Sequence, residues 1–360
     1  MTKQQLQEQF SQPLLTWFDT FGRKNFPWQN PRTPYRVWIS EIMLQQTQVK
    51  TVIPYFDRFM NHFPDIHHLA AAPEDQVLAL WSGLGYYSRA RNLIKTAKII
   101  CAEYQGEFPH RLEELLALPG IGDSTAAAIA SQAFNLPAAI LDGNVKRVLC
   151  RYFMIEGWPE QATVKKNLWQ LANQCMPNYR CADYTQAIMD LGATCCTMRN
   201  PNCYHCPLQE TCLAKLHDKI NFYPQKKPKK ALPHRKEQFL LLHTAENQIY
   251  LEKRPPIGLW GGLWCIPSID MNTCPKEHIK KIYNLDCLTA KEMMNLKHSF
   301  SHFHLHIKAI EIQVTPSPNT LVETNGRWFK LNEISHIGLA KPITAIITRF
   351  QENLGSGDVC

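Results

Sequence analysis

The sequence predicts a multidomain chain, with an all-α part followed by a smaller α+β part. Three observations support this fold class. Apolar residues recur at helical spacing through about residue 220, and prolines fall mostly between the periodic segments. Beyond residue 237 the apolar pattern shortens to the alternation typical of strands. The 360 residues are enough for two or three domains.

The first part is expected to consist of many short helices. Proline cannot continue a helix, so prolines between the periodic segments favour several short helices over a few long ones. The expected helices cover residues 76–81, 90–104, 112–118, 124–134, 164–175 and 184–192.

A basic, proline-rich segment separates the two parts. Residues 224–236 read PQKKPKKALPHRK and contain no acid. Such a segment cannot bury a core, so we expect an extended tether that is either only solvated or also lies along phosphates.

The second part is expected to mix strands with two helices, and residues 255–258 (PPIG) are expected to form a turn. The expected strands are 238–243, 248–252, 263–267 and 301–312, and the expected helices are 275–283 and 340–353.

Composition restricts the environment in which the chain works. No apolar run approaches the roughly 18 residues that span a bilayer, and the polar start of the chain has no secretory pattern. Thirteen cysteines in such a chain favour a reducing compartment, and we expect a cytoplasmic protein without a membrane partner. The net charge of +8 favours a polyanionic partner only weakly.

Four cysteines near the end of the first part stand at metal-ligand spacing. Cys196, Cys203, Cys206 and Cys212 are separated by six, two and five residues. Both zinc and a [4Fe–4S] cluster accept four thiolates, so spacing alone does not choose between them. With the preceding DLGA, the run resembles the iron–sulfur loop of the endonuclease III branch of helix-hairpin-helix DNA glycosylases. That resemblance implies a [4Fe–4S] cluster, with Cys195 as a spare thiol or a competing ligand.

Two glycines are predicted to form a tight turn in front of a helix. In LPGIGDST, residues 118–125, the turn at Gly120 and Gly122 presents backbone N–H groups that can hold a phosphate, although a plain helix–helix connection fits as well. The segment resembles the DNA-binding hairpin of the glycosylase family, and the resemblance implies DNA contacts at both glycines.

One aspartate is predicted to cap a helix. Asp142, in LDGNVKRV, follows an apolar run, and a carboxylate held by helix N–H groups stays ionised at neutral pH. Such a charge suits the stabilisation of a cationic sugar. In the glycosylase family this position carries the essential aspartate, and Asn144 is expected to orient Asp142 or the attacking water.

The segment WISEIMLQQTQV, residues 38–49, is predicted to be helical. Glu41, Gln45 and Gln48 would then share one face, which is either a solvated stripe or the wall of a nucleic-acid cleft. The segment closely resembles a motif of MutY-type adenine DNA glycosylases, in which the glutamate is the catalytic acid. This resemblance implies DNA contacts by Gln45, Gln46, Thr47 and Gln48.

Two further positions extend the resemblance. In GLGYYSRARNL, residues 83–93, Tyr86 corresponds to the residue that family members wedge into the base stack, although a core tyrosine fits the same pattern. Ser124 stands where family members that also cut the DNA backbone carry a lysine. Serine cannot form a Schiff base, so little or no lyase activity is expected.

The second part resembles a Nudix-type fold over residues 239–267. The glutamate run of the Nudix box is absent after Gly262, so pyrophosphate hydrolysis is not expected. MutY-type enzymes use such a domain to recognise 8-oxoguanine, and their FSH motif appears here as Phe300, Ser301 and His302. Histidines at 302, 304 and 306 alternate along the expected strand, but a metal site is disfavoured because no acid or cysteine lies nearby in sequence.

The resemblance covers about residues 17–342 and implies both a domain division and a reaction. A glycosylase domain would occupy residues 1–222, with a six-helix barrel at about 30–136 and an iron–sulfur module from 1–29 plus 137–222. The linker would be 223–237, and the Nudix-like domain 238–355.

The implied substrate is duplex DNA with adenine opposite 8-oxoguanine or guanine. The implied enzyme is a monomer in the cytoplasm, associated with the nucleoid when bound to DNA. Glu41, with a raised pKa, would protonate the extruded adenine, and Asp142 would stabilise the sugar cation. The alternatives are an endonuclease III-like enzyme for oxidised pyrimidines, a non-catalytic DNA-damage binding protein and, least favoured, a Nudix hydrolase. The implied adenine pocket consists of Trp28, Gln29, Ser124 and Gln186.

Overall fold

The computed structural model describes residues 2–227, 231–315 and 325–355. By its internal contacts the chain divides into two compact units. The first contains Met1–Ala71 and Lys95–Lys229, and the second contains Ala72–Ile94 and Lys230–Cys360. Among the described residues, no helix combines the length and the apolar character needed to cross a membrane.

The described part of the first unit is helical, and it contains the predicted helices at 112–118, 124–134, 164–175 and 184–192. Helix α7 enters it at Lys95, which agrees with the expected helix 90–104. The helices are α1 (Lys3–Leu6), α2 (Gln12–Phe21), α3 (Pro34–Leu44), α4 (Val49–His62), α5 (Ile66–Ala71), α7 (Ser88–Glu103), α8 (Leu112–Ala117), α9 (Asp123–Phe134), α10 (Gly143–Tyr152), α11 (Ala162–Cys175), α12 (Cys181–Asp190) and α13 (Leu213–Leu216).

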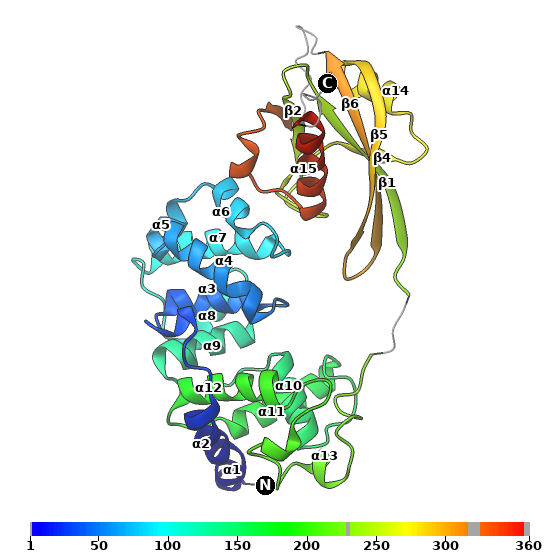
Figure 1. Cartoon of the computed structure of the whole chain (residues 1–360). Helices are drawn as coiled ribbons and strands as arrows, with labels where there is room; N and C mark the ends of the chain where they lie inside the picture. The colour runs from blue at the N-terminus through cyan, green and yellow to red at the C-terminus, as the bar shows by residue number, and fades with distance from the viewer. Residues whose placement is uncertain (1, 228–230, 316–324, 356–360) are drawn as a thin grey trace. The chain divides into compact units, whose positions relative to one another are not determined.

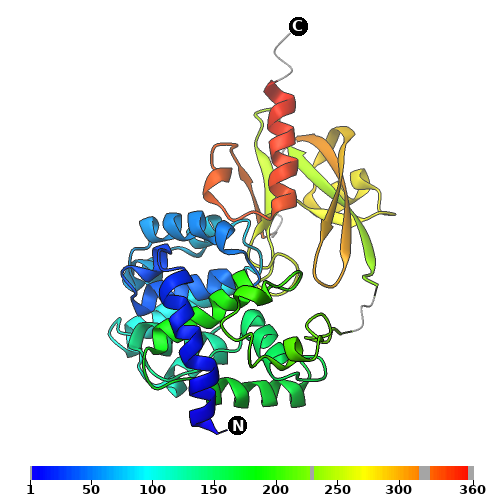
Figure 2. The same ribbon diagram turned by 60° about the horizontal axis from the view of Figure 1, so that its bottom comes forward.

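Helix packing in the first unit brings distant segments together. Helix α9 packs against both α3 and α12, and α12 packs against α2 (Figures 1 and 2). The N-terminal residues Phe10, Leu14 and Phe18 are fully or almost fully buried in a core shared with residues between 139 and 223. This packing holds α3 and α12, which are far apart in sequence, against α9.

The second unit contains a mixed seven-stranded sheet. The main order is β3-β2-β1-β6-β5, with β4 paired to β1 and β7 to β2; among these described strands β1 and β6 run parallel and the other pairs run antiparallel. Side chains alternate between the two faces of β1, so Leu240 and Leu242 pack towards α14 whereas His243 contacts Phe350 of α15. Figure 1 labels both helices beside the sheet. The elements are β1 (His234–His243), β2 (Ile249–Lys253), β3 (Trp264–Cys265), β4 (Ser268–Asp270), α14 (Pro275–Tyr283), β5 (Asp286–Ser299), β6 (His304–Thr315), β7 (Gly326–Phe329) and α15 (Lys341–Gly355).

The strands and helices predicted for the second part are present, but most of their limits differ, and the strand expected at 263–267 is reduced to β3 (Trp264–Cys265). Strand β1 begins at His234. Residues 234–237 of the expected linker therefore pair with β6 and are not an unpaired tether. Residues 228–230 of that linker lie outside the described residues. Strand β6 begins at His304, so the FSH residues precede it and His302 does not share the strand face of His304 and His306.

Residues 72–94 belong to the second unit, although the sequence-based division assigns them to the helical domain. They contain α6 (Glu74–Trp81), which was predicted as 76–81, and the first turns of α7. Asp75 pairs with Lys253 at 2.8 Å, and the Ser82 hydroxyl donates to the Leu339 carbonyl at 2.8 Å. These bonds tie the segment to the residues around the sheet.

Candidate active site

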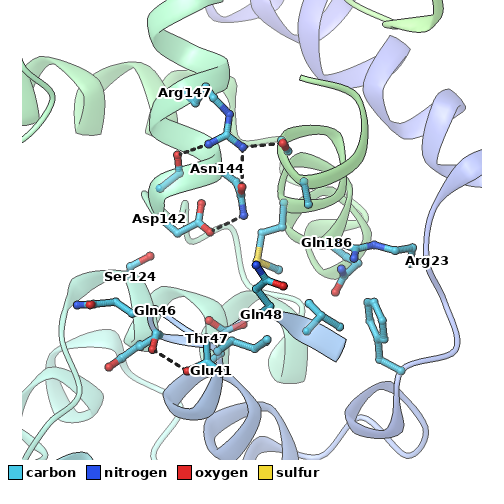
Figure 3. A pocket seen from close by; sticks show the side chains of 18 of the residues that line it. Arg23, Glu41, Gln46, Thr47, Gln48, Ser124, Asp142, Asn144, Arg147 and Gln186 are labelled. Carbon is cyan, nitrogen blue, oxygen red and sulfur yellow. Dashed lines mark hydrogen bonds between the residues drawn. The ribbon is translucent and has the colours of Figure 1, made fainter. Parts of the chain in front are cut away.

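Glu41 and Asp142 line the same cavity of about 820 Å³ in the first unit. Glu41 comes from the middle of α3 and Asp142 from the N-terminus of α10, and Figure 3 shows them on opposite sides of the cavity. Ligand pockets are typically about 300–1,000 Å³, so the cavity that the two acids line is large enough for a nucleoside. Other lining residues include Arg23, Phe26, Trp28, Thr125, Gln186, Met189 and Met198.

Glu41 is a carboxyl group with an unusually high proton affinity. Burial and the negative charge of Asp142 raise the pKa of Glu41 to about 7, against a hydrogen bond from Gln132 that lowers it. Its neighbours Ile42 and Met43 are buried, which excludes water from the helix around it. A carboxyl that is half protonated near neutral pH can act as a general acid there.

Asp142 is the N-cap of α10, as predicted, and it accepts the Val145 N–H at 2.8 Å. Capping is not the only influence on its charge, because burial raises the pKa of Asp142 while hydrogen bonds from Val145 and Asn144 lower it. The negative charge of Asp142 nevertheless contributes to the raised pKa of Glu41. The donors on the Asp142 carboxylate favour its charged form, so Asp142 suits the charged role and Glu41, with its raised pKa, suits the role of proton donor.

A chain of hydrogen bonds orients the Asp142 carboxylate. The Asn144 amide donates to Asp142 at 3.2 Å, and Arg147 donates to the Asn144 oxygen at 2.7 Å (Figure 3). Arg147 also donates to the carbonyls of Gly192 and Cys196, at 2.6 and 2.7 Å. A side chain at Gly192 would collide with Asn144. Glycine is therefore needed where residues Leu191–Cys195, which follow α12, approach α10.

The prediction that Glu41, Gln45 and Gln48 share one helical face is wrong. Helix α3 ends at Leu44, Gln46 adopts a left-handed conformation with φ of 59°, and Gln48 caps α4. The glutamines therefore lie on a turn between two helices, where they are free of the helical repeat. All four residues of this turn still line the cavity: Gln45, Gln46, Thr47 and Gln48.

The four residues predicted for the base pocket divide into three that line the cavity and one that does not. Trp28, Ser124 and Gln186 line it. Gln29 is instead buried within its own loop, where it accepts the Phe26 N–H at 2.9 Å and donates to a backbone carbonyl at 3.1 Å. Gln29 shapes the loop that carries Trp28, and in this structure it does not line the cavity.

Arg23 and Asp190 are parts of the site that the sequence did not reveal. Arg23 donates to the fully buried carboxylate of Asp190 at 2.7 Å, across 167 positions of sequence. Asp190 also accepts a hydrogen bond from the Gln186 amide nitrogen at 2.8 Å. The Gln186 oxygen is then the group available to a ligand. No local pattern announces a pair this far apart, although the family motif around DLGA contains Asp190.

The glycine turn has the predicted geometry. It joins α8 to α9, with Gly120 at φ of 77° and Gly122 as the N-cap of α9. Any side chain at Gly120 would be strained in this left-handed conformation. The N–H groups at the start of α9 are consequently available to an anion, as the hairpin resemblance implies.

Tyr86 belongs to the second unit and is not a core tyrosine. Its side chain is 49% exposed, and its backbone is left-handed, with φ of 48°. The Arg89 guanidinium lies 5.6 Å from the centre of its ring. An exposed aromatic ring of this kind can insert into a base stack.

The FSH residues form the turn between β5 and β6. The Phe300 N–H donates to the Phe303 carbonyl at 2.9 Å, and the Phe300 ring stacks on Phe303 at 4.7 Å. Ser301 and His302 at the tip are exposed, and their side chains lie 3.4 Å apart. A rigid aromatic base therefore presents two polar side chains to the outside.

The four predicted cysteine ligands line one small hollow, together with Cys195. Arg151, which is only 2% exposed, donates to the Cys196 sulfur at 3.3 Å, and its other bonds in the described chain reach backbone carbonyls. A buried guanidinium without a carboxylate calls for another anion, and a thiolate-bound centre supplies one. Although no described group of three side chains stands in metal-binding geometry, the chemistry of this donor set fits a thiolate-ligated metal centre.

Comparison with known proteins identifies the family. Residues 39–174 match the HhH-GPD superfamily base excision DNA repair proteins, and residues 238–349 match the NUDIX domain. An adenine DNA glycosylase of Buchnera aphidicola subsp. Baizongia pistaciae is 43% identical over 350 residues, which cover 95% of this chain and 97% of that one. The chain belongs to the adenine DNA glycosylase family.

More distant members and one solved structure agree with this assignment. The adenine DNA glycosylase of Mus musculus is 31% identical over 96% of this chain and 78% of its own. The structure of a thermostable thymine-DNA glycosylase aligns with a TM-score of 0.54 and 30% identity over 59% of this chain and 98% of that one. The predicted family and fold class, a helix-hairpin-helix core followed by a Nudix-like α+β domain, are thereby confirmed.

Proposed function

We infer that this protein is a DNA glycosylase that removes adenine from DNA in base excision repair, by hydrolysis of the N-glycosidic bond. The observation that carries this conclusion is the placement of Glu41 and Asp142 in one cavity, where burial and the nearby Asp142 raise the pKa of Glu41 to about 7, so that Glu41 can give a proton and Asp142 can supply a charge. Enzymes that hydrolyse a glycosidic bond typically use two carboxyl groups with these roles.

The residues of the cavity suggest how the reaction proceeds. Adenine is undamaged and stacked, so it must first be extruded into the cavity. There the Gln186 oxygen can accept a hydrogen bond from the exocyclic amine of adenine. Glu41 then donates a proton to N7, and adenine leaves as a neutral base. Asp142, held by Asn144, stabilises the oxocarbenium-like sugar until water attacks and an abasic site remains.

We propose that the natural substrates are adenine–8-oxoguanine and adenine–guanine mispairs in duplex DNA, bound by one copy of the chain in the cytoplasm. The turn at Gly120 and Gly122, the turn at residues 45–48 and Tyr86 would contact the duplex. Ser301 and His302 would contact 8-oxoguanine. The endonuclease III-like alternative is not favoured by the relatives, which are adenine DNA glycosylases. Ser124 also lacks the amine that a lyase needs.

A duplex assay tests the proposed function. The protein is incubated with an adenine–8-oxoguanine duplex, and hot alkali then cleaves the DNA at any abasic site. Strand cleavage that depends on the alkali, with no borohydride-trapped adduct, is the expected result. Intact strands after treatment with folded, metal-loaded protein would rule the function out, and cleavage of a duplex with oxidised pyrimidines instead would support the alternative.

The excision rate is expected to fall as the pH rises through about 7. Glu41 must be protonated to act, and its pKa of about 7 means that the protonated fraction falls about tenfold per pH unit above that value. The measurement is the single-turnover dependence of excision on pH at subsaturating enzyme, which reports the free protein. A rate that stays constant between pH 6 and about pH 9 would contradict this role of Glu41.

The double variant Ser301→Ala/His302→Ala is expected to lose preference for 8-oxoguanine over guanine by about thirtyfold, because two lost hydrogen bonds at about 1 kcal/mol each amount to about 2 kcal/mol. Excision from the adenine–guanine duplex should change little. The exposed Ser335→Ala substitution in the same unit is the control. Equal losses on both duplexes would remove the two residues from lesion recognition.

We propose that Cys196, Cys203, Cys206 and Cys212 hold a [4Fe–4S] cluster, which is common in the endonuclease III-like family. When bound, such a cluster supplies a redox-active centre and cross-links this loop through its thiolates. Chemical analysis of anaerobically purified protein should find about four irons and four sulfides per chain, and Cys203→Ser should lower both values. One zinc and no sulfide per chain would instead identify a zinc site.

A further inference from the structure

Gln132 is a buried amide that contacts the general acid from a different helix. It lies on α9, its side chain is 5% exposed, and its Nε2 donates to Glu41 Oε1 at 3.1 Å. It does not line the cavity, so it is placed behind Glu41 and not beside the substrate. The packing of α9 on α3 brings the two side chains together.

The surroundings of Gln132 make its hydrogen bond significant. Helix α9 reads DSTAAAIASQAF, and Ala128, Ile129 and Ala130 in the turn before Gln132 are almost completely buried. Burying an amide among apolar side chains costs free energy unless the amide finds a partner. Glu41 is that partner for the amide nitrogen, so the bond fixes one oxygen of the acid relative to α9.

We propose that Gln132 is a positioning residue that determines which oxygen of Glu41 carries the catalytic proton. Oε1 accepts the hydrogen bond from the Gln132 amide. A proton on Oε1 that pointed towards Gln132 would be repelled by the amide hydrogen. The proton therefore resides on Oε2, the oxygen that remains for the substrate. This inference rests on the proposed function, since it assigns Gln132 a part in the proton transfer to adenine.

The same bond also tunes the acid. A donor to a carboxylate favours the charged form, so the Gln132 amide lowers the pKa of Glu41 while burial and Asp142 raise it. Without the donor, Glu41 would stay protonated to a higher pH. It would also rotate more freely, because among the described residues Gln132 is the donor that holds Oε1.

A titration of Glu41 tests this inference without reference to activity. Protein carrying glutamate labelled with carbon-13 at the carboxyl group is titrated by NMR, and the signal lost in Glu41→Gln identifies Glu41. Gln132→Leu, and Gln132→Met as a longer replacement, should raise the pKa of Glu41 by about one unit. Ser131, like Gln132, lies on α9, and its buried hydroxyl accepts a hydrogen bond from Thr185 of α12, so Ser131→Ala removes a neighbouring polar group and should leave that pKa unchanged.

Kinetics then distinguish positioning from packing. In Gln132→Leu the alkaline limb of the excision profile should move up with the measured pKa, and the plateau rate should fall about tenfold, since proton transfer depends on alignment. DNA affinity should stay the same. An unchanged Glu41 pKa and alkaline limb in both Gln132 variants would overturn the inference. Absence of adenine excision by the wild-type protein would refute the proposed function, while the NMR titration would still decide the role of Gln132.

Discussion

Glu41→Gln should lower the rate of adenine excision by about a thousandfold or more and leave the affinity for the mismatched duplex nearly unchanged. Glutamine fills the same volume and keeps hydrogen-bonding capacity, but it has no proton to donate at N7, and a positioned general acid is worth about 10²–10⁴ in rate. The measurement pairs single-turnover excision with a binding titration on the same duplex.

The control for this substitution is Glu113→Gln on α8. Glu113 is exposed, with a side chain 76% accessible, and it lies in the same unit. The same chemical change should there leave both excision and binding as in the wild type. If Glu41→Gln lost binding in proportion to excision, Glu41 would be a DNA contact and the acid would have to be sought elsewhere in the cavity.

The sequence predicted α6 to α9, α11 and α12, because apolar periodicity and prolines are local signals, but it did not predict α2 or α4, and α4 continues through Pro54. It failed where tertiary packing or a turn decides the backbone. The left-handed residue Gln46 ends α3 early, and nothing in QQTQV announces it. Strand β5 was also missed. Within the described part of the chain it is an edge strand paired with β6, and the exposed residues of β5 lack the apolar alternation that marks a half-buried strand.

The candidate site was predictable only in part, and for a related reason. Asp142 and Ser124 stand at helix starts that the sequence marks clearly. The family motif identified Glu41, but its raised pKa depends on burial and on Asp142, a hundred residues away. Gln132 and Asp190 act through contacts between helices, so their roles become visible only once α3, α9 and α12 are packed together.

Asp142→Asn should reduce excision by about 10²–10³ while the protein stays folded. Asparagine caps a helix about as well as aspartate, so α10 should keep its first turn and thermal stability should change little. What is lost is the charge that faces the sugar cation, and removing one such electrostatic stabiliser typically costs this much in rate. Asp57→Asn, at an exposed position of α4, is the matched control.

The same substitution should also change the titration of Glu41, because the charge of Asp142 is one of the two causes of its raised pKa. With asparagine at 142 the pKa of Glu41 should fall, so the residual excision should lose its alkaline limb at a lower pH than in the wild type. An Asp142→Asn protein that excises adenine within tenfold of the wild-type rate, with the Glu41 titration unmoved, would reduce Asp142 to a helix cap. The two acids would then not act as a pair, and the charge that offsets the sugar cation would have to come from the substrate itself.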